Sequence, residues 1–376
     1  MEKKKILVLG STGSIGQQTL DVVRQNLDLF ELEGISCNDN IELIEQQAQE
    51  FGIKKVAIAN KKRLDKNRSG WYWGDEGIEE MIENSSAELV VIAISGAKSL
   101  LPTLRAIGKG KNIALASKEV MVLAGELVNQ KIKERGVKLF PIDSEHSAIW
   151  QALRSGKSEE IEKIILTCSG GPFRNLDQGD FEKITVEQAL NHPNWSMGRR
   201  ITIDCATLMN KGLEFIEAKW LFDLKDEQIQ VVIHPQSLIH SAIQFQDGSI
   251  MAQIGDKDMR VAIQYALTYP DRVKNSLNRI SWWDGLKMDF EKPNFDKFPC
   301  LGYAMEASRV GGTMSVVLNA ADEVAVRMFL EKKIKFTDIP KIVEKVMAKH
   351  RAIKNPSLNQ ILEVDVWARG EAEIRQ

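Results

Sequence analysis

The segment Ile6-Leu7-Val8-Leu9-Gly10-Ser11-Thr12-Gly13-Ser14-Ile15-Gly16 joins a short apolar run to a turn that contains three glycines. Four consecutive apolar residues are typical of a strand buried on both faces of a parallel sheet. The glycines permit a tight turn and a close backbone approach to phosphate, and a helix that starts at Gly16 offers unpaired N–H groups. The spacing is GxxGxxG rather than GxGxxG, so the alternative is a glycine-rich turn without a ligand. The order of strand, turn and helix favours dinucleotide binding.

The first 150 residues repeat this alternation of strand and helix. Such an alternation predicts an α/β fold with a parallel sheet that is covered on both faces. Asn40 stands where it would cap one helix, and Gly136 follows another helix at a C-cap position. The charged insertion Lys61–Gly77 fits neither pattern. Strands are expected at Ile6–Leu9, Leu32–Ser36, Val56–Ala59, Leu89–Ile94, Ile113–Ala116 and Val137–Ile142, and helices at Gly16–Gln25, Ile41–Phe51 and Glu119–Glu134.

The whole chain divides into three predicted domains. Residues 1–142 form the Rossmann-like domain with the parallel sheet. Residues 143–290 mix strands (Ile164–Thr167, Val231–Ile233, Ser249–Gln253) with helices and a long polar loop, which indicates an α+β domain. Residues 291–300 form a linker. Residues 301–376 form a helical domain, with helices expected at Leu301–Arg309, Thr313–Glu331, Ile339–Lys349 and from Ser357, which has capping-box spacing to Gln360.

Composition excludes several classes of protein. Among 376 residues 43% are hydrophobic, which is ample for buried cores and excludes a disordered chain. A net charge of −2 provides no basic field for nucleic acid. No apolar run reaches the length of a signal-peptide core or a membrane span, so we expect a cytoplasmic protein without membrane contact. The four cysteines are too scattered for a zinc site or a disulfide framework.

The end of the second strand should recognise the 2′ group of a dinucleotide. The sequence there is Ser36-Cys37-Asn38-Asp39-Asn40. An acidic residue at this place favours a free ribose hydroxyl, and a cation favours a 2′-phosphate. Ser36 and Asn38 can donate to a phosphate, whereas Asp39 would repel one. These residues alone therefore leave NAD and NADP both open.

Asp143-Ser144-Glu145-His146 follows the sixth strand, where ligands bind in open α/β sheets. Two carboxylates two residues apart can converge on a hard cation such as Mg²⁺ or Mn²⁺, and Glu214 would supply a third. The alternative is an ordinary helix N-cap followed by acidic first-turn residues, because a helix is expected at Ser147–Leu153. Since no Cys or His cluster lies nearby in the sequence, an oxygen-ligated metal is preferred over zinc.

The polar stretch from His192 to Glu214 carries a second group of candidates. His192-Pro193-Asn194-Trp195-Ser196-Met197-Gly198 places a large aromatic in a polar loop, as in a flexible lid. Asn210, Lys211 and Glu214 have helical spacing, so one helix face offers an amide, a cation and an anion to one ligand. The alternative is a solvated helix with an ordinary Lys–Glu pair.

Three further segments have weaker signals. The glycines and hydroxyls of Ser169-Gly170-Gly171-Pro172-Phe173 suit an anion, or form only a turn. Ser117-Lys118-Glu119 starts a helix, where an exposed Lys118 would be unfavourable, so a ligand role is preferred over an exposed cation. We interpret His234 and His240 as structural or interface residues.

With these residues assembled, the chain resembles the 1-deoxy-D-xylulose 5-phosphate reductoisomerase family over nearly its whole length. The resemblance implies a homodimeric, NADPH-dependent enzyme of the non-mevalonate isoprenoid pathway that makes 2-C-methyl-D-erythritol 4-phosphate. It implies a divalent metal (Mg²⁺, Mn²⁺ or Co²⁺), which chelates the sugar's ketone and hydroxyl, and inhibition by phosphonate hydroxamates. The matching blocks are Gly10–Gly16, Ser117–Glu119, Asp143–Glu145, Ser169–Phe173, His192–Gly198, Asn210–Glu214, His234–Ser237 and Leu318–Glu323.

Carried over by position, the resemblance implies three sets of site residues. Cofactor contacts would come from Thr12, Gly13, Ser14, Ile15, Asn38, Ser117, Glu119 and Gly198. Metal ligands would be Asp143, Glu145 and Glu214. Substrate contacts and catalytic residues would come from Lys118, Ser144, Glu145, Ser169, His192, Trp195, Cys205, Asn210, Lys211 and Glu214.

Three positions depart from the family pattern. A basic residue is expected where Cys37 stands, Asn at Ser117 and Ser at Cys205. The Cys205 thiol is only a weak hydrogen-bond donor and acceptor, so one contact to the substrate phosphate would be weaker or differently made. Two other functions stay open on the sequence. One is another nicotinamide-dependent dehydrogenase with structural carboxylates, and the other is a non-catalytic dinucleotide sensor whose helical domain binds a partner.

Overall fold

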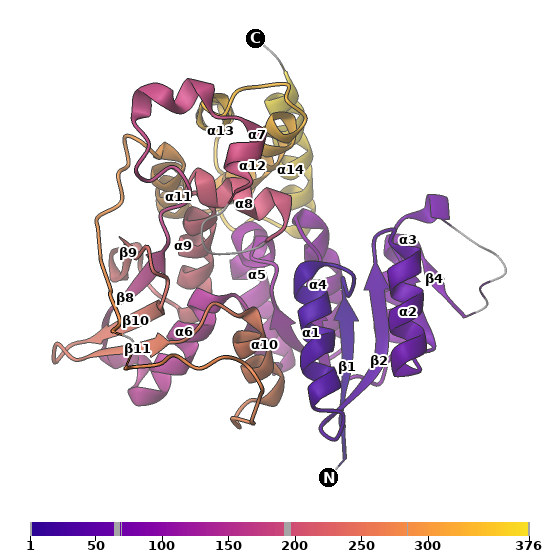
Figure 1. The fold of residues 1–376 in the computed structure, drawn as a ribbon. Coiled ribbons are helices and arrows are strands. Elements are labelled where there is room, and N and C mark those ends of the chain that lie inside the picture. Colours follow the sequence, from indigo (N-terminus) through magenta and orange to yellow (C-terminus); the bar gives the residue numbers. More distant parts are fainter. Residues whose placement is uncertain (1, 64–67, 69, 192–196, 284, 375–376) are drawn as a thin grey trace. The chain divides into compact units, whose positions relative to one another are not determined.

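The computed structural model describes residues 2–63, 68, 70–191, 197–283 and 285–374 (Figure 1). The chain forms two compact units, each assembled from three separate segments. Unit 1 contains Met1–Val120, Val128–Ser147 and Asp258–Leu277, and unit 2 contains Met121–Leu127, Ala148–Lys257 and Asn278–Gln376. Among the helices of the described residues, none combines the length and the apolar composition that a membrane span requires.

Unit 1 is built on a parallel sheet, as the alternation of strands and helices predicts, and the sheet has seven strands where the sequence indicated six. Each predicted strand is present, within a few residues of its expected ends. From edge to edge the order is β4 (Tyr72–Trp73), β3 (Lys55–Ile58), β2 (Phe30–Cys37), β1 (Lys4–Leu9), β5 (Leu89–Ile92), β6 (Asn112–Leu115) and β7 (Leu139–Pro141). The chain reverses its direction of travel across the sheet between β1 and β5, which is where ligands bind in such folds.

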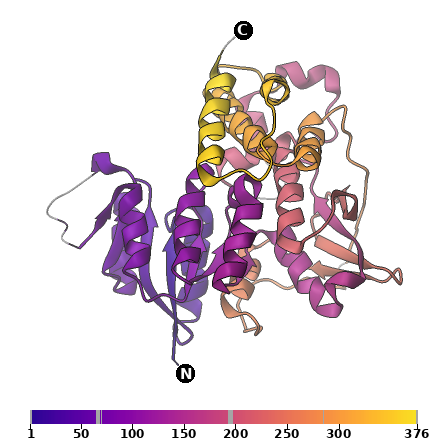
Figure 2. The ribbon, with the colours of Figure 1, turned by 180° about the vertical axis from the view of Figure 1, so that it is seen from behind.

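Helices cover both faces of this sheet. α1 (Ser14–Gln25) and α10 (Met259–Thr268) lie side by side on one face (Figure 1). α3 (Gly74–Glu83) and α4 (Leu100–Gly108) lie on the other face (Figure 2). An ion pair between Arg260 Nη1 and Asp21 Oδ2 at 2.7 Å joins α10 to α1. The segment that carries α10 therefore returns to the sheet long after the sheet's own strands have ended.

Local signals set the ends of other helices in this unit. α2 (Ile41–Phe51) is capped as predicted, because the Asn40 side chain accepts a hydrogen bond from Leu43 N. α5 (Glu119–Arg135), which contributes to both units, ends as predicted at Gly136, whose φ is +65°. The insertion that fitted neither pattern supplies the edge strand β4 and the start of α3, and residues 64–67 and 69 lie outside the described part.

Unit 2 contains a four-stranded sheet in the order β11 (Ile250–Ile254), β10 (Ile239–Phe245), β8 (Ile161–Cys168) and β9 (Ile229–Ile233). β8 and β9 run parallel, whereas β10 pairs antiparallel with both of its neighbours. The sequence predicted three of these strands and missed β10. In the described residues of both units, short 3₁₀ turns occur at Lys61–Arg63, Ala97–Ser99, Leu153–Ser155, Ser158–Glu160, Gln178–Lys183 and Asp226–Gln228.

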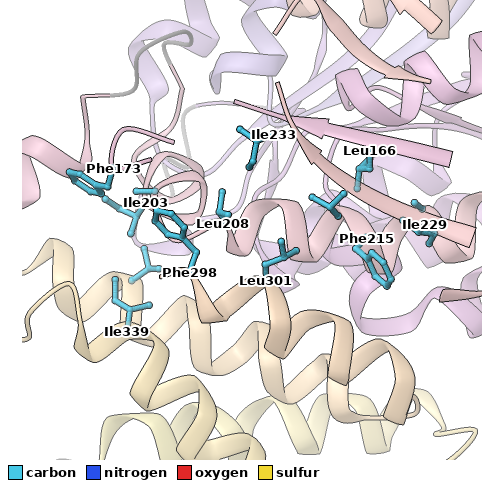
Figure 3. Close-up of a cluster of buried hydrophobic side chains, with 14 of the residues drawn as sticks. Leu166, Phe173, Ile203, Leu208, Phe215, Ile229, Ile233, Phe298, Leu301 and Ile339 are labelled. Carbon is cyan, nitrogen blue, oxygen red and sulfur yellow. The ribbon is translucent and has the colours of Figure 1, made fainter. Parts of the chain in front are cut away.

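The helices of unit 2 pack on this sheet and on one another. Ser357 caps the last helix through the predicted capping box with Gln360. Side chains from β8, β9, α9 and the C-terminal helices interdigitate in one apolar core, including Leu166, Phe215 and Leu301 (Figure 3). The helices are α6 (Ser144–Ala152), which begins in unit 1, α7 (Val186–Ala189), α8 (Arg199–Ala206), α9 (Met209–Phe222), α11 (Pro299–Val310), α12 (Met314–Leu330), α13 (Asp338–Lys349) and α14 (Leu358–Glu373).

Candidate functional site

Two glycines of the N-terminal turn are required by close backbone contacts. Gly10 has a φ of +90°, and a Cβ there would lie 2.4 Å from the Ala93 carbonyl oxygen. A Cβ on Gly16 would lie 2.1 Å from the Gly10 carbonyl oxygen. Gly13 and Ser14 are exposed at the start of α1, which among the described residues has no side-chain cap and no first-turn acid. The positive end of α1 is therefore open to an anionic ligand.

A glutamine that the sequence analysis missed holds this turn from α2. Ser11 Oγ donates to Gln47 Oε1 at 2.7 Å, and Gln47 Nε2 donates to the Ser11 carbonyl oxygen at 3.1 Å. Both side chains are buried. This pair of hydrogen bonds fixes the turn between the strand and the helix. No local sequence motif predicts this pairing of Ser11 with Gln47, because the two residues are 36 positions apart.

The end of β2 exposes only part of the set of side chains that the sequence suggested. Cys37 is buried, its thiol donates to the Asn40 carbonyl oxygen, and burial raises the pKa of this thiol to about 11. Ser36 Oγ accepts a hydrogen bond from Gly10 N at 3.1 Å. Asn38 and Asp39 are exposed. Position 37 therefore faces the core of unit 1, and the next two residues face solvent.

Ser117, Lys118 and Glu119 are all buried at the start of α5. Glu119 Oε1 accepts a hydrogen bond from Gly96 N at 3.0 Å, and Ser117 Oγ donates to the Ile94 carbonyl oxygen. Lys118 is only 7% exposed, so the alternative of an exposed cation is wrong. Its Nζ lies 3.0 Å from Asp143 Oδ2, which joins this segment to the end of β7.

Asp143, Ser144 and Glu145 form a compact polar turn after β7. Asp143 Oδ1 accepts from Glu145 N at 3.2 Å, as a capping residue would, while Oδ2 faces Lys118. One carboxylate oxygen of Asp143 and one of Glu145 lie within 4.8 Å of each other. Ser144 Oγ donates to Glu145 Oε2 at 2.5 Å. The capping hydrogen bond and the two close carboxylates occur together, so the two interpretations of this turn do not exclude each other.

In unit 2, α9 carries a buried polar face. Asn210, Lys211 and Glu214 are 9%, 2% and 1% exposed, so the alternative of a solvated helix is wrong. Asn210 Nδ2 donates to Glu214 Oε1 at 2.6 Å, and Lys211 Nζ forms an ion pair with Glu214 Oε2. The buried carboxylate of Glu214 is therefore held in place by an amide and a cation of its own helix.

The Ser169–Phe173 loop, which follows β8, packs on the end of α8 in the same unit. Gly171 has a φ of +70°, and a Cβ there would lie 2.6 Å from the Cys205 carbonyl oxygen. Ser169 Oγ accepts from Gly171 N at 3.3 Å. Ser169 and Cys205 are both partly exposed. The close approach of backbone to backbone brings their two segments together.

His234 has a structural role, as the sequence analysis expected. Its Nε2 accepts hydrogen bonds from Leu238 N and Ile239 N, so Nδ1 carries the proton and donates to the Asp289 carbonyl oxygen at 2.9 Å. The ring therefore holds a turn and is not available to a metal. His240 is buried, and this burial lowers its pKa, which keeps it neutral.

The His192–Gly198 segment is only partly described. His192 and Trp195 lie outside the described residues. Gly198 is exposed and immediately precedes α8.

Three family models together match most of the chain. Residues 6–125 match the model described as 1-deoxy-D-xylulose 5-phosphate reductoisomerase. Residues 139–222 match the model of the 1-deoxy-D-xylulose 5-phosphate reductoisomerase C-terminal domain, and residues 254–371 match the DXP reductoisomerase C-terminal domain.

Full-length relatives carry the same name. The 1-deoxy-D-xylulose 5-phosphate reductoisomerase of Thermoanaerobacter pseudethanolicus is 49% identical over 371 residues, which cover 96% of each chain. That of Bacillus subtilis is 48% identical over 375 residues, which cover 98% of each chain.

Solved structures are similar over the same length. The Zymomonas mobilis reductoisomerase in complex with NADPH is 39% identical, with a TM-score of 0.91 and coverage of 99% of this chain and 98% of that chain. A reductoisomerase in complex with NADPH, fosmidomycin and magnesium is 38% identical, with a TM-score of 0.92 and coverage of 98% and 97%.

Proposed function

Because this chain belongs to the 1-deoxy-D-xylulose 5-phosphate reductoisomerase family, we propose which of its residues perform each part of that family's reaction. The enzyme rearranges and reduces 1-deoxy-D-xylulose 5-phosphate to 2-C-methyl-D-erythritol 4-phosphate in the non-mevalonate isoprenoid pathway, with NADPH and a divalent metal ion. The observation that carries this conclusion is the 49% identity to a named relative over 96% of both chains.

For the metal, we propose Asp143, Glu145 and Glu214 as ligands. Three observations support this set: all donors are carboxylate oxygens, Asp143 and Glu145 lie close together, and Glu214 is a buried carboxylate. Hard cations such as Mg²⁺, Mn²⁺ and Co²⁺ accept such ligands. When bound, the metal polarises the substrate ketone and stabilises negative charge on its oxygens. A magnesium ion is present in the fosmidomycin complex of a relative.

For NADPH, we propose the turn before α1 as the pyrophosphate site, with Thr12, Gly13, Ser14 and Ile15. The uncapped start of α1 and the required glycines at positions 10 and 16 support this assignment. The exposed Asn38 would contact the ribose phosphate. The remaining proposed contacts are Ser117, Glu119 and Gly198.

For the substrate, we propose that the phosphate is bound by Ser169, His192, Cys205, Asn210 and Lys211. The packing of the Ser169 loop on the end of α8, and the buried cation of Lys211, support a phosphate site in unit 2. Ser144 and Lys118 would contact the sugar end, where the Lys118 ammonium can donate to the oxygens that develop charge.

For the lid, we propose that Trp195 closes over the substrate and the nicotinamide. The support is in the sequence: a large aromatic stands in a polar loop between Pro193 and Gly198. A closed lid excludes water from the aldehyde that forms before hydride transfer. Arg199 is exposed beside this segment, so trypsin cleavage after Arg199 should slow when NADPH, metal and a phosphonate are added together. Equal cleavage with and without these ligands would contradict the lid.

We further propose a homodimer, a cytoplasmic location and inhibition by phosphonate hydroxamates. Exposed apolar side chains on the edge strand β11 and in the loop after α10 support a second copy of this chain as the binding partner. These are Ile250, Met251, Trp282 and Trp283, and Trp283 is 97% exposed. Large apolar side chains that remain exposed favour an interface between proteins if they gather on one face. Sedimentation at varied concentration tests the dimer.

The deciding experiment follows NADPH oxidation with 1-deoxy-D-xylulose 5-phosphate, with and without Mg²⁺ or Mn²⁺. We expect turnover only with substrate and metal together. Turnover of another substrate without metal would favour a different dehydrogenase. Tight NADPH binding with no turnover of any sugar phosphate would favour a sensor.

A further inference from the structure

A network of charged side chains within unit 2 joins α8 to two C-terminal helices. Arg200 on α8 forms an ion pair with Glu323 on α12, with Nη1 and Oε1 2.7 Å apart, and donates to Asn319 Oδ1 at 3.0 Å. Glu323 is also paired with Arg369 on α14, at 2.6 Å from Nη2. Burial alone raises the pKa of Glu323, but the two guanidiniums lower it below its usual value. Glu323 is therefore the ionised partner of both arginines.

Two more carboxyls, Asp204 on α8 and Asp322 on α12, lie on the inner side of Arg200. Arg200 Nε is 3.5 Å from Asp204 Oδ2, and Nη2 is 3.8 Å from Asp322 Oδ2. Asp204 is 3% exposed and Asp322 is fully buried. Within the described chain, no protein donor hydrogen-bonds to either oxygen of Asp322. A fully buried carboxylate without such donors is strongly disfavoured and takes up a proton instead.

The charges around Asp322 point the same way. Burial, and then the neighbouring charge of Asp204, raise the pKa of Asp322 well above its usual value, and Arg200 only partly opposes them. The same two aspartates, after burial, raise the pKa of Cys300 on α11. The linked side chains around Asp322 comprise two cations and four carboxyls. They are Arg200, Arg369, Asp204, Asp322, Glu323 and Asp365.

We propose that Asp204 and Asp322 share one proton, and that this pair together with Arg200 holds α8 in the position its two ends require. Gly198 precedes α8 and Cys205 lies in its last turn. Both are proposed above to contact cofactor or substrate, so the functional half of the inference rests on that proposed function. Asp204, Asp322 and Arg200 are positioning residues, because they act through α8.

The physical reason is that two buried carboxylates beside the same guanidinium, that of Arg200, disfavour each other's ionised form. Two ionised carboxylates are acceptors only and repel each other. One proton turns one of them into a donor, and the resulting charge-assisted hydrogen bond ties α8 to α12. The proton also lowers the negative charge beside the two arginines from four carboxylates to three. Either aspartate can carry the proton, since the pair titrates as a unit.

The first test compares the thermal unfolding of wild type and Asp322→Asn across pH, without substrate. The pKa of Asp322 is raised on folding, so the stabilising proton is fully bound below the unfolded pKa and is lost as pH rises through the folded pKa. The neutral asparagine keeps a donor and avoids this loss. We expect the Tm of Asp322→Asn minus that of wild type to increase by roughly 3 °C between about pH 5 and about pH 9. A difference that does not change with pH would overturn the shared proton.

A double-mutant cycle adds an independent check. If one proton serves both carboxyls, Asp204→Asn and Asp322→Asn each leave one charge for Arg200 and are tolerated. The double variant leaves Arg200 without either carboxylate, so its Tm should fall by more than the sum of the single effects. Additive effects would contradict the proposal.

The positioning role has its own readout. Asp322→Leu keeps the approximate size but removes the hydrogen bond, and we expect the KM for 1-deoxy-D-xylulose 5-phosphate to rise by about tenfold while kcat changes less. Asp322→Asn should rescue the KM.

Arg309→Met, which removes an exposed ion pair on α11, is the matched control and should leave KM unchanged. An unchanged KM in Asp322→Leu would overturn the positioning role, and if that variant does not fold, the KM of Asp204→Asn/Asp322→Asn decides. The unfolding arms need no substrate, so failure of the proposed function would be seen separately, as wild-type inactivity.

Discussion

The Nζ atom of Lys118 lies 3.0 Å from Oδ2 of Asp143, and the two side chains are only 8% and 13% exposed. A buried ion pair forms only where both charges are needed or well compensated, because removing them from water is costly. This pair sets an ammonium beside a proposed metal ligand. It also links the start of α5 to the turn after β7, so the sheet presents a cation and two carboxylates at one edge.

We expect Lys118→Met to separate turnover from metal binding. The change removes a donor to the substrate oxygens, and kcat should fall by on the order of 100-fold or more. The affinity for Mn²⁺ should not fall, because one cation that repels the metal has been removed. Steady-state kinetics and Mn²⁺ titration without substrate measure the two effects.

Lys111→Met is the matched control for Lys118. Lys111 is also a buried lysine of unit 1, but it donates to the carbonyl oxygens of Ser85 and Ala87. Its replacement should lower Tm and leave kcat unchanged. If Lys118→Met lost Mn²⁺ affinity along with turnover, the lysine would be supporting the metal ligands rather than the substrate.

Glu214→Gln should abolish most turnover while the fold survives. The amide can still accept from Asn210, but it removes the negative charge that a metal and Lys211 both require. We expect kcat/KM to fall by on the order of 100-fold or more and Mn²⁺ to bind more weakly. Circular dichroism and thermal unfolding establish that the protein is folded. Activity like that of wild type in this variant would remove Glu214 from the metal site.

The preference for NADPH over NADH should depend on Asp39 more than on Cys37. Asp39 is exposed at the end of β2, where a carboxylate repels a 2′-phosphate, whereas the Cys37 thiol points into the core. Asp39→Asn should increase the ratio of kcat/KM for NADPH to that for NADH by about 5-fold, the effect of one solvent-screened charge. Cys37→Ser should leave the ratio unchanged. A larger change from Cys37→Ser than from Asp39→Asn would show that position 37 takes part in recognising the phosphate.

The sequence predicted the N-terminal sheet well because its signals are local. Apolar runs such as Leu89–Ile92 indicate buried strands. Asn40 begins a helix through its side chain, and Gly136 ends one through its backbone conformation. β10 and α10 were missed, because their partners are distant in sequence. α10 is placed by packing on α1 and by the Arg260–Asp21 ion pair, neither of which has a local signature.

The candidate site shows the same division. Spacing placed Asn210, Lys211 and Glu214 on one helix face, but only the fold shows that this face is buried. Lys118 had a weak sequence signal, a mildly unfavourable cation at a helix start, and the sequence did not pair it with Asp143. Gln47 had no signal at all, and Asp322 appeared only as a member of the matching block Leu318–Glu323. Their roles come from hydrogen bonds and burial between elements that the sequence cannot pair.

Replacing Cys205 with serine should strengthen substrate binding. Cys205 lies in the last turn of α8, and its backbone carbonyl is close to Gly171 of the Ser169–Phe173 loop. A hydroxyl is a better hydrogen-bond donor to a phosphate oxygen than a thiol is, and it is small enough for the same space. We expect Cys205→Ser to lower the KM for 1-deoxy-D-xylulose 5-phosphate by about 3- to 10-fold, with kcat and the KM for NADPH little changed.

The same substitution at Cys37, in unit 1, is the control and should not alter the KM for the sugar phosphate. Inhibition by inorganic phosphate gives an independent reading, because its inhibition constant should fall in parallel. If Cys205→Ser changes neither constant, the thiol does not face the phosphate, and the binding falls to Ser169, Asn210 and Lys211.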